Sequence, residues 1–421
     1  MLDLKFIREH PDVVKRGMKS KGVTDRVDEL LKLDERRRSL IQKSEGLKAK
    51  KNAVSAEIAR MKESRKDVAK SVSDMNAVKE EIKALDEQLS TVEQEVGRIL
   101  LSIPNIPHPS VPVGTQPADN QEILRWGESV EVDFTLKPHW ELGEKLEVID
   151  FARGGKVTGS AFPFLVGKGA RLERALINFF LDEAIAQGYR EIMPPLLVNE
   201  ASASGTGQLP DKEDLMYVLE REQLYLVPTA EVPVSNFHRD ETLREEDLPV
   251  CYAAYTPCFR REAGSYGKDV RGLNRVHQFD KVELVKFVHP SGSYDELEKL
   301  RKDAERLLQL LGLSYRVLLM CTGELGFTQS KKYDLEVYAP AQKKWLEVSS
   351  CSNFEAFQAR RMNIRFKPKG GGKPEFVHTV NGSALALPRV VAALIEQYQT
   401  PEEKVIIPKV LHKYTEFEVI G

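Results

Sequence analysis

Residues 251–287 read CYAAYTPCFRREAGSYGKDVRGLNRVHQFDKVELVKF. Two runs rich in aromatic and β-branched residues flank a connection rich in glycine and arginine, and runs of this composition are typical of strands. The stretch therefore predicts an antiparallel hairpin whose connection is unusually long. Connections longer than about a dozen residues are uncommon unless they have a function, so we expect this one to bind a ligand.

The hairpin carries basic residues at the ends of both predicted strands and in the loop between them. Arg260 and Arg261 end the first run and Arg275 precedes the second, while Lys268 and Arg271 lie in the loop. Guanidinium groups fixed on a sheet suit a polyphosphate, and a mobile basic loop suits the end of a nucleic acid. Composition leaves open the alternative of a charged surface hairpin without a ligand.

Composition describes an ordinary soluble protein of two or three domains. The 421 residues are 41% hydrophobic and 30% charged, which is enough for a large core. The apolar stretches are far shorter than the roughly 20 residues of a membrane helix, and residues 1–10 carry acids too early for a signal peptide. We therefore expect a cytoplasmic protein with no membrane segment. Free thiols are expected rather than a zinc site, because no C-x-x-C pair occurs among Cys251, Cys258, Cys321 and Cys351.

Residues 26–102 contain no proline and few glycines, and they predict a pair of long helices. Apolar residues recur every seven positions over 33–68, and a second series over 75–99 alternates steps of three and four. This is the heptad pattern of a coiled coil. The polar stretch 63–74 is the expected point of reversal, so the two helices should form an antiparallel hairpin. The first series is the weaker one, because its companion positions include Arg37, Ser44 and Lys51.

The function of this helical arm stays open on the residues alone, since most two-helix coiled coils are spacers or dimerisation devices. Residues 1–102 hold 23 Lys+Arg against 19 Asp+Glu, whereas the remainder holds 39 against 45. A modest positive excess permits contact with nucleic acid but does not establish it. The basic residues that could meet phosphates cluster along the first predicted helix: Arg36, Arg37, Arg38, Lys43, Lys48, Lys50 and Lys51.

Residues 104–117 hold five prolines and cannot continue a helix. They predict a semi-rigid linker between an N-terminal domain over 1–103 and a C-terminal domain over 118–421. In the C-terminal domain, a helix is expected over 172–186, followed by Gly188, a short strand and Pro194-Pro195.

Residues 224–231 read LYLVPTAE, a predicted strand that ends in polar groups. A carboxylate such as that of Glu231 at a strand end can hold a substrate ammonium through charge-assisted hydrogen bonds. The Thr229 hydroxyl and the backbone around Ala230 would add orientation. A helix N-terminus is the alternative, because Thr and Glu also suit the first helical turn.

Two later segments carry oxygen ligands and a basic residue. Residues 333–338 (YDLEVY) and 345–352 (WLEVSSCS) are expected to be neighbouring strands. Glu347 and Ser350 in the second are hard ligands that suit Mg²⁺ bridging nucleotide phosphates. Residues 380–389 (VNGSALALPR) lead into an apolar helix, and an arginine at its start would meet an anionic phosphate. A surface glutamate and a plain capping turn are the alternatives.

Taken in order, these segments resemble the signature motifs of the class II aminoacyl-tRNA synthetases. In the residues that make up the motifs, they resemble the seryl-tRNA synthetase family in its form without zinc. The hairpin is similar to the second motif and residues 380–389 to the third, with Pro388 where many members have glycine. Residues 171–198 resemble the first motif, which forms the dimer interface in that family. The resemblance implies an α+β fold, with an antiparallel two-helix coiled-coil arm for the variable arm of tRNA and a catalytic domain on a mixed, mainly antiparallel sheet flanked by helices.

The resemblance also implies the reaction and its partners. The carboxylate of serine would attack the α-phosphate of ATP, pyrophosphate would leave and seryl-adenylate would form. The seryl group would then move from the adenylate to the 3′-terminal adenosine of tRNA(Ser), with release of AMP. Such chemistry needs positioning and charge neutralisation more than a protein base. Mg²⁺, a homodimer and tRNA(Sec) as a further candidate substrate belong to the same expectation. A synthetase-like enzyme that loads a carrier protein and a non-catalytic RNA-binding scaffold are the alternatives.

Residue roles follow from the same resemblance. Arg260 and Arg389 would be the catalytic residues, with Arg260 on the α-phosphate and Arg389 with Arg275 on the β- and γ-phosphates. Phe279 would stack on adenine and Glu262 would contact it, while Glu347 and Ser350 would hold Mg²⁺. The rest of the implied ATP site is Arg261, Val276, Val348 and Ser349, and serine would lie among Thr229, Ala230, Glu231, Arg260, Glu283 and Ser383.

Overall fold

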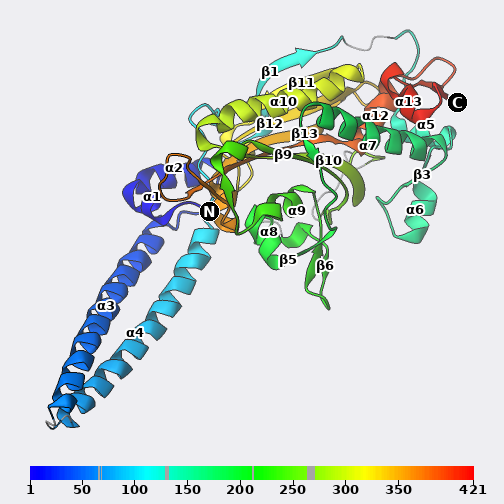
Figure 1. Cartoon of the computed structure of the whole chain (residues 1–421). Coiled ribbons are helices and arrows are strands. Elements are labelled where there is room, and N and C mark those ends of the chain that lie inside the picture. The colour runs from blue at the N-terminus through cyan, green and yellow to red at the C-terminus, as the bar shows by residue number, and fades with distance from the viewer. Residues whose placement is uncertain (65–66, 68, 129–131, 211–212, 263–270) are drawn as a thin grey trace. The chain divides into compact units, whose positions relative to one another are not determined.

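The computed structural model of the chain describes residues 1–421 except 65–66, 68, 129–131, 211–212 and 263–270. The described chain divides into two compact units, one from Leu2 to Pro104 and one from Asn105 to Gly421 together with Met1 (Figure 1). The proline-rich segment after Pro104 folds with the larger unit. The Asn105 side chain donates hydrogen bonds to the backbone carbonyls of Thr328 (3.0 Å) and Phe354 (2.8 Å).

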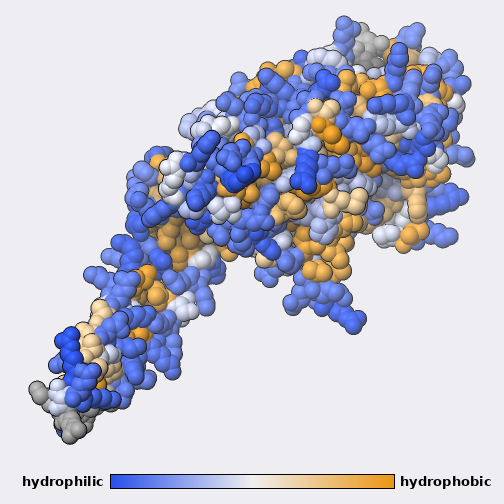
Figure 2. Space-filling view, in the orientation of Figure 1, coloured by the Kyte–Doolittle hydropathy of each residue, from blue (hydrophilic) through white to orange (hydrophobic). Residues whose placement is uncertain are grey.

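The smaller unit contains the predicted pair of long helices. Its helices are α1 (Leu4–Glu9), α2 (Pro11–Ser20), α3 (Val27–Glu63) and α4 (Ala69–Leu101). The predicted reversal is confirmed, because α3 ends and α4 begins within residues 63–74. Leu40 of the first heptad series and Ile82, Val92 and Ile99 of the second are buried. Hydrophilic residues cover most of the visible surface of these helices, with apolar side chains between them (Figure 2).

Two of the polar positions that weaken the first heptad series, Arg37 and Ser44, pair with acidic residues across the seam. Ser44 donates a hydrogen bond to Asp86 (2.8 Å), and Arg37 donates one to Glu93 (3.2 Å). Lys48 also binds Asp86, with its ammonium nitrogen 3.0 Å from the carboxylate. Residues later in α3 therefore meet residues earlier in α4, as the antiparallel prediction requires. Polar pairs of this kind fix the register of a coiled coil at some cost in stability.

The larger unit is built on a mixed, mainly antiparallel sheet, so the predicted α+β class is confirmed. Only the β4–β9 pair of the described sheet is parallel. In spatial order its described strands are β1 (Gln121–Trp126), β11 (Tyr315–Leu319), β12 (Lys331–Ala339), β13 (Lys344–Glu355), β16 (His378–Ala386), β10 (Gln278–Val288), β9 (Val250–Phe259) and β4 (Arg190–Glu191).

The opening hairpin occupies β9 and β10 of this sheet. The two strands are antiparallel, with Phe259 opposite Gln278 and Val250 opposite Phe287, so the predicted hairpin is confirmed. The middle of its connection, with Lys268, lies outside the described residues.

Three long helices cover one face of the sheet, whereas α9 (Glu231–Ser235) and α11 (Phe357–Met362) cover only part of the other, where they pack against Val285 and Phe287 of β10. Leu176 of α7 (Lys168–Ala186), Leu300 of α10 (Ser293–Leu310) and Val390 of α12 (Leu387–Gln397) share a single core with Val282 and Leu284 of β10 (Figure 1). Successive side chains of a strand point to opposite faces. Phe279, Lys281 and Glu283, which alternate with these core residues, therefore point to the opposite face.

Shorter elements complete the larger unit. The remaining helices are α5 (His139–Lys145), α6 (Phe151–Val157), α8 (Glu200–Thr206) and α13 (His412–Thr415). The remaining strands, in small sheets, are β2 (Ile149–Asp150), β3 (Phe164–Leu165), β5 (Leu197–Asn199), β6 (Val218–Leu219), β7 (Leu224–Leu226), β8 (Thr242–Arg244), β14 (Arg365–Lys367), β15 (Glu375–Phe376), β17 (Val405–Ile406) and β18 (Val419–Ile420). Among the described residues, no helix is long and apolar enough to cross a membrane.

Candidate active site

A cavity of about 490 Å³ opens on the sheet face that lacks the core helices. Strands β10, β13 and β16 form its floor, and the ends of the hairpin loop form one wall. The predicted site residues that line it are Thr229, Glu231, Arg260, Glu262, Arg275, Val276, Phe279, Glu283, Glu347, Val348, Ser350, Ser383 and Arg389.

A buried carboxylate organises one end of the cavity. Glu283 is 2% exposed, and its Oε2 accepts hydrogen bonds from the hydroxyls of Thr229 (3.3 Å) and Ser383 (3.2 Å). Ser383 lies directly opposite Glu283 in the β10–β16 pairing. The sheet register therefore brings together residues that lie a hundred positions apart in the sequence.

Lys281 is a member of this group that sequence reasoning missed. Its ammonium nitrogen lies 2.5 Å from Glu283 Oε2 and donates a hydrogen bond to the Thr229 hydroxyl (2.8 Å). Both side chains of the ion pair are almost fully buried. A lone buried carboxylate would be costly, so Lys281 compensates the charge of Glu283 and holds it in place. The signal in the sequence was its period-two spacing from Phe279 and Glu283.

Glu231 begins a helix and also faces the cavity, so the two interpretations of residues 224–231 are compatible. It is the first residue of α9, and its backbone N–H donates to the Thr229 hydroxyl (3.1 Å). The buried Gln358 amide donates to the Glu231 carboxylate (2.7 Å) and accepts from the Thr379 hydroxyl (2.7 Å). The carboxylate is thus oriented from behind by a chain of buried hydrogen bonds.

The two ends of the hairpin loop bring a guanidinium and an aromatic ring together. The guanidinium carbon of Arg260 lies 5.1 Å from the ring centroid of Phe279, and Arg260 Nε donates to the Pro228 carbonyl (3.2 Å). Across the loop, Arg275 pairs with Glu262 (2.9 Å). Glu262 has a φ of 48°, a left-handed conformation that costs a non-glycine residue energy and is common at functional sites.

Arg389 lies in the first turn of α12, where Pro388 fits the helix start as expected. Its guanidinium donates to the backbone carbonyls of Asn274 (3.0 Å) and Glu347 (2.6 Å). Burial lowers the pKa of this guanidinium from its ordinary value, and the nearby positive charges of Arg260 and Arg275 lower it further, against the opposing effect of Glu347. The three arginines therefore make one positively charged wall.

A β-bulge explains how Glu347 and Ser350 reach the same cavity although they are three residues apart. Strand β13 carries one extra residue, because Leu335 pairs with Ser349 whereas the next residue, Glu336, pairs with Glu347. The extra residue is Val348, and it reverses the alternation of faces at that point. Without the bulge, Glu347 and Ser350 would point to opposite faces of the sheet.

Behind this strand lies a buried aspartate that was not predicted. The Ser350 hydroxyl donates to Asp334 Oδ1 (2.8 Å), and Lys332 lies 3.4 Å from the other oxygen of Asp334. Burial and the Glu347 carboxylate raise the pKa of Asp334. Asp334 and Glu347 raise the pKa of Lys332, although burial opposes them. Ser350 thus contacts a buried pair of opposite charges, Asp334 and Lys332.

The structure does not bring every predicted residue to the cavity wall. The side chain of Ser349 points away and donates to the Ser383 carbonyl (2.7 Å), while Ala230 and Arg261 are not among the lining residues. Asn381 does line the cavity, and its buried Nδ2 has no hydrogen-bond partner in the described part of the chain. Its position two residues before Ser383 on β16 was a signal for it in the sequence.

Comparisons with known proteins match the whole length of the chain. Residues 1–107 match the seryl-tRNA synthetase N-terminal domain, and residues 217–398 match the tRNA synthetase class II core domain (G, H, P, S and T). The serine–tRNA ligase of Carboxydothermus hydrogenoformans is 52% identical over 415 residues, which is 98% of each chain. That of Salinibacter ruber is 53% identical over 425 residues, with 100% of this chain and 99% of the relative covered.

A comparison with solved structures also matches the chain to a seryl-tRNA synthetase. The crystal structure of seryl-tRNA synthetase from Pyrococcus horikoshii complexed with ATP superposes with a TM-score of 0.95 at 39% identity. The match covers 100% of this chain and 99% of that one.

Proposed function

The chain belongs to the seryl-tRNA synthetase family and is an ATP-dependent serine–tRNA ligase, and from that premise we propose how its cavity divides the two small substrates. The observation that carries the proposal is the polarity of the cavity. Arg260, Arg275 and Arg389 form its positive wall, whereas the charge of the buried Glu283 carboxylate is compensated by Lys281. ATP occupies the positive wall and serine the end with Glu283.

The positive wall provides fixed guanidinium groups around the ring of Phe279, and this combination suits ATP. Arg260 contacts the α-phosphate, because its side chain binds the Pro228 carbonyl and so lies beside Thr229, where serine is proposed to bind. Arg275 and Arg389 hold the outer phosphates, and Phe279 stacks on adenine with Glu262 beside it. Fixed guanidinium groups suit phosphate oxygens geometrically as well as electrostatically. This preorganised charge stabilises the pentavalent α-phosphate and the leaving pyrophosphate without a protein nucleophile.

For serine, the buried end offers complementary polar groups. Glu231 and the Thr229 segment hold the ammonium group, and the Glu283 carboxylate accepts a hydrogen bond from the serine hydroxyl. Asn381, whose amide lines the same end of the cavity, adds a donor for an oxygen of serine or of the α-phosphate. A site built to bind a hydroxyl disfavours alanine strongly, because its buried polar groups would be left unpaired.

The donor set at Glu347 and Ser350 fits Mg²⁺. Because the Ser350 hydroxyl donates its hydrogen to Asp334, its lone pairs remain available to a cation. Mg²⁺ is usually held by one or two protein oxygens together with substrate phosphates, and Glu347 lies beside the phosphate-binding Arg389. When bound, the ion would supply charge neutralisation on the phosphates, while Glu347 and Ser350 hold it against the sheet.

Replacing Ser350 with alanine should raise the Mg²⁺ concentration needed for half-maximal ATP–pyrophosphate exchange by about tenfold, the scale seen when a metal site loses an oxygen or its support. Ser349→Ala is the matched control, since it removes a hydroxyl from the opposite face of the same strand. The Mg²⁺ requirement of that variant should match the parent. Equal Mg²⁺ requirements in all three proteins would show that Ser350 does not hold the ion.

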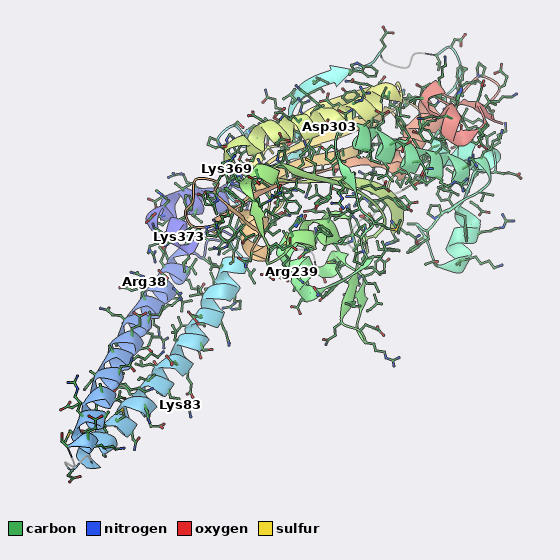
Figure 3. All side chains as sticks on the ribbon, in the orientation of Figure 1. Arg38, Lys83, Arg239, Asp303, Lys369 and Lys373 are labelled. Atoms are coloured by element: carbon green, nitrogen blue, oxygen red, sulfur yellow. The ribbon has the colours of Figure 1, made fainter. Side chains whose placement is uncertain are left out.

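The macromolecular partners follow the same proposal. The arm grips tRNA(Ser) through basic side chains such as Lys83, which projects from α4 (Figure 3), and tRNA(Sec) is a second candidate. A homodimer is supported by exposed apolar side chains on and around α7, namely Phe164, Val166, Ile185 and Met193, because apolar patches mark association surfaces. We also propose that the protein is located in the cytoplasm.

The reaction is tested most directly by ATP–pyrophosphate exchange with serine, threonine and glycine, followed by charging of tRNA. Exchange with serine alone and transfer to tRNA(Ser) is the expected result. Exchange without transfer to tRNA would favour an enzyme that loads a carrier protein. RNA binding without exchange would favour a non-catalytic scaffold.

A further inference from the structure

A histidine far from the hairpin in sequence is buried against the base of its loop. His139 begins α5, and its side chain is 0% exposed. Its Nε2 accepts a hydrogen bond from the backbone N–H of Leu273 (2.9 Å). A neutral imidazole that accepts at one nitrogen carries its proton on the other. Nδ1 therefore donates to the Glu396 carboxylate, 2.9 Å away.

Glu396 accepts hydrogen bonds from this histidine and from a neighbouring turn at residues 341–342. The carboxylate is 0% exposed and also accepts from the Gln342 amide (2.7 Å) and from the backbone N–H of Ala341 (3.1 Å). Gln342 in turn accepts from the Asn274 amide (2.7 Å). Two separate contacts, from His139 and from Gln342, thus tie one buried carboxylate to residues 273–274 of the loop base.

The same carboxylate belongs to the helix that presents Arg389. Glu396 lies seven residues after Arg389 in α12, which is two helical turns, so the two side chains share a face of the helix. The Arg389 Nε donates to the backbone carbonyl of Asn274 (3.0 Å). The loop base is therefore held by two side chains from one face of α12, directly by Arg389 and through His139 by Glu396.

Gly272 shows how closely the loop approaches the histidine. Its φ is +63°, and a Cβ at this position would lie 2.2 Å from His139 Nε2. A side chain here would meet both backbone strain and a direct overlap. The close approach places the Leu273 N–H within hydrogen-bonding distance of the ring, and Arg275 follows two residues later.

We propose that His139, oriented by Glu396, is a positioning residue that clamps the base of the hairpin loop and so sets the placement of Arg275 and Arg389 against the phosphates of ATP. The proposal rests on the phosphate roles proposed above for these two arginines. A buried, hydrogen-bonded polar pair is not needed to fill space, because apolar residues of similar volume pack at least as well. What the pair supplies is a fixed acceptor for one backbone N–H.

Two substitutions separate the two hydrogen bonds of the ring. His139→Asn keeps an amide near Nδ1 that can donate to Glu396, but nothing in it reaches the Leu273 N–H. His139→Gln places an amide oxygen near the position of Nε2, where it can accept from Leu273. A displacement of about 1 Å of positioning groups can cost about 10²-fold in rate. We therefore expect His139→Asn to lower kcat/KM for ATP by roughly 10–100-fold in pyrophosphate exchange, with the KM for serine unchanged, and His139→Gln to recover most of the loss.

A second variant approaches the same contact from the loop. Gly272→Ala pushes the loop away from the ring and should show the same loss for ATP. Because both changes break one contact, the double variant Gly272→Ala with His139→Asn should be little worse than either single variant, whereas independent effects would multiply. This comparison holds even if both single variants lose some stability, which thermal unfolding of each protein would report.

Several results would overturn the clamp. Equal kcat/KM values for ATP in the His139→Asn and His139→Gln variants would do so. A rise in the KM for serine that parallels the loss for ATP would also do so, as would losses in the double variant that multiply those of the single variants. Arg389→Ala distinguishes this failure from a failure of the proposed ATP site. If Arg389→Ala leaves ATP kinetics intact, the phosphate role itself is wrong, whereas a loss there without a loss in His139→Asn removes only the clamp.

Discussion

Replacing Glu283 with alanine is expected to lower kcat/KM for serine in ATP–pyrophosphate exchange by about 10³-fold, or ~4 kcal/mol of transition-state stabilisation. The change removes the acceptor around which Thr229, Lys281 and Ser383 are arranged. Since the proposed role of Glu283 is recognition of the serine hydroxyl, the preference of the enzyme for serine over alanine should collapse toward unity in the variant. Exchange measured with both amino acids tests the role more sharply than the rate alone.

Controls for this prediction come from the same strand. Glu283→Ala leaves Lys281 buried without its partner, which typically costs about 3 kcal/mol of stability, so Glu283→Gln serves as a second variant of similar shape. Asp280→Asn removes a carboxylate from the opposite face of β10, where Asp280 binds the Tyr255 hydroxyl (2.8 Å). Serine activation should survive in Asp280→Asn. Unchanged serine-dependent exchange in both Glu283 variants would sink the proposed role.

Much of this architecture could be predicted because local patterns and sheet pairing agree. The aromatic and β-branched composition of the second run of the hairpin predicts a strand, and the structure confirms it as β10. The apolar helix predicted to follow residues 380–389 is present as α12 (Leu387–Gln397). In each case the composition of a short segment was enough.

Other features depend on pairings that no single segment encodes. The bulge at Val348 is visible only in the register against β12, so a spacing of three between Glu347 and Ser350 gave no reason to place both in one cavity. Lys281 reads as an ordinary exposed lysine until its neighbours across the sheet are known. His139 lies more than 130 residues before Leu273, and nothing local marks it as part of the hairpin.

The arm shows the reverse case, in which an apparent weakness of the pattern has a structural reason. Arg37 and Ser44 interrupt the first heptad series, and both bind acidic residues of α4. Each pair has one residue on each helix, so the sequence of the first helix alone shows an interrupted heptad pattern. Several of the basic residues that were candidates for phosphate contact are used within the arm in this way, including Arg37 and Lys48. Other candidates, among them Arg36, Lys43 and Lys50, are exposed, and so are Lys79 and Lys83 of α4, which were not among those candidates.

Deleting residues 30–100 and closing the gap with a short Gly/Ser linker is expected to leave serine-dependent ATP–pyrophosphate exchange near the parent rate. Charging of tRNA(Ser) should fall by roughly 10³-fold in kcat/KM, the scale of affinity that several phosphate contacts supply. The two effects should separate because the cavity residues all lie in the larger unit, from Gln208 to Arg389. Parallel exchange and charging assays on one preparation measure both. Charging at the parent rate would reduce the arm to a spacer.

A finer variant tests whether charge on the arm, rather than its bulk, binds tRNA. Lys51, Lys79 and Lys83 line one groove between α3 and α4. Replacing all three with alanine should weaken tRNA binding and flatten its salt dependence by about three units of log–log slope, since each lost phosphate contact removes about one. The control removes three exposed lysines from the larger unit, namely Lys302, Lys344 and Lys413. If both triple variants change the slope equally, the effect is one of net charge. If only the groove variant changes it, the lysines of the groove are phosphate contacts and the arm acts by binding.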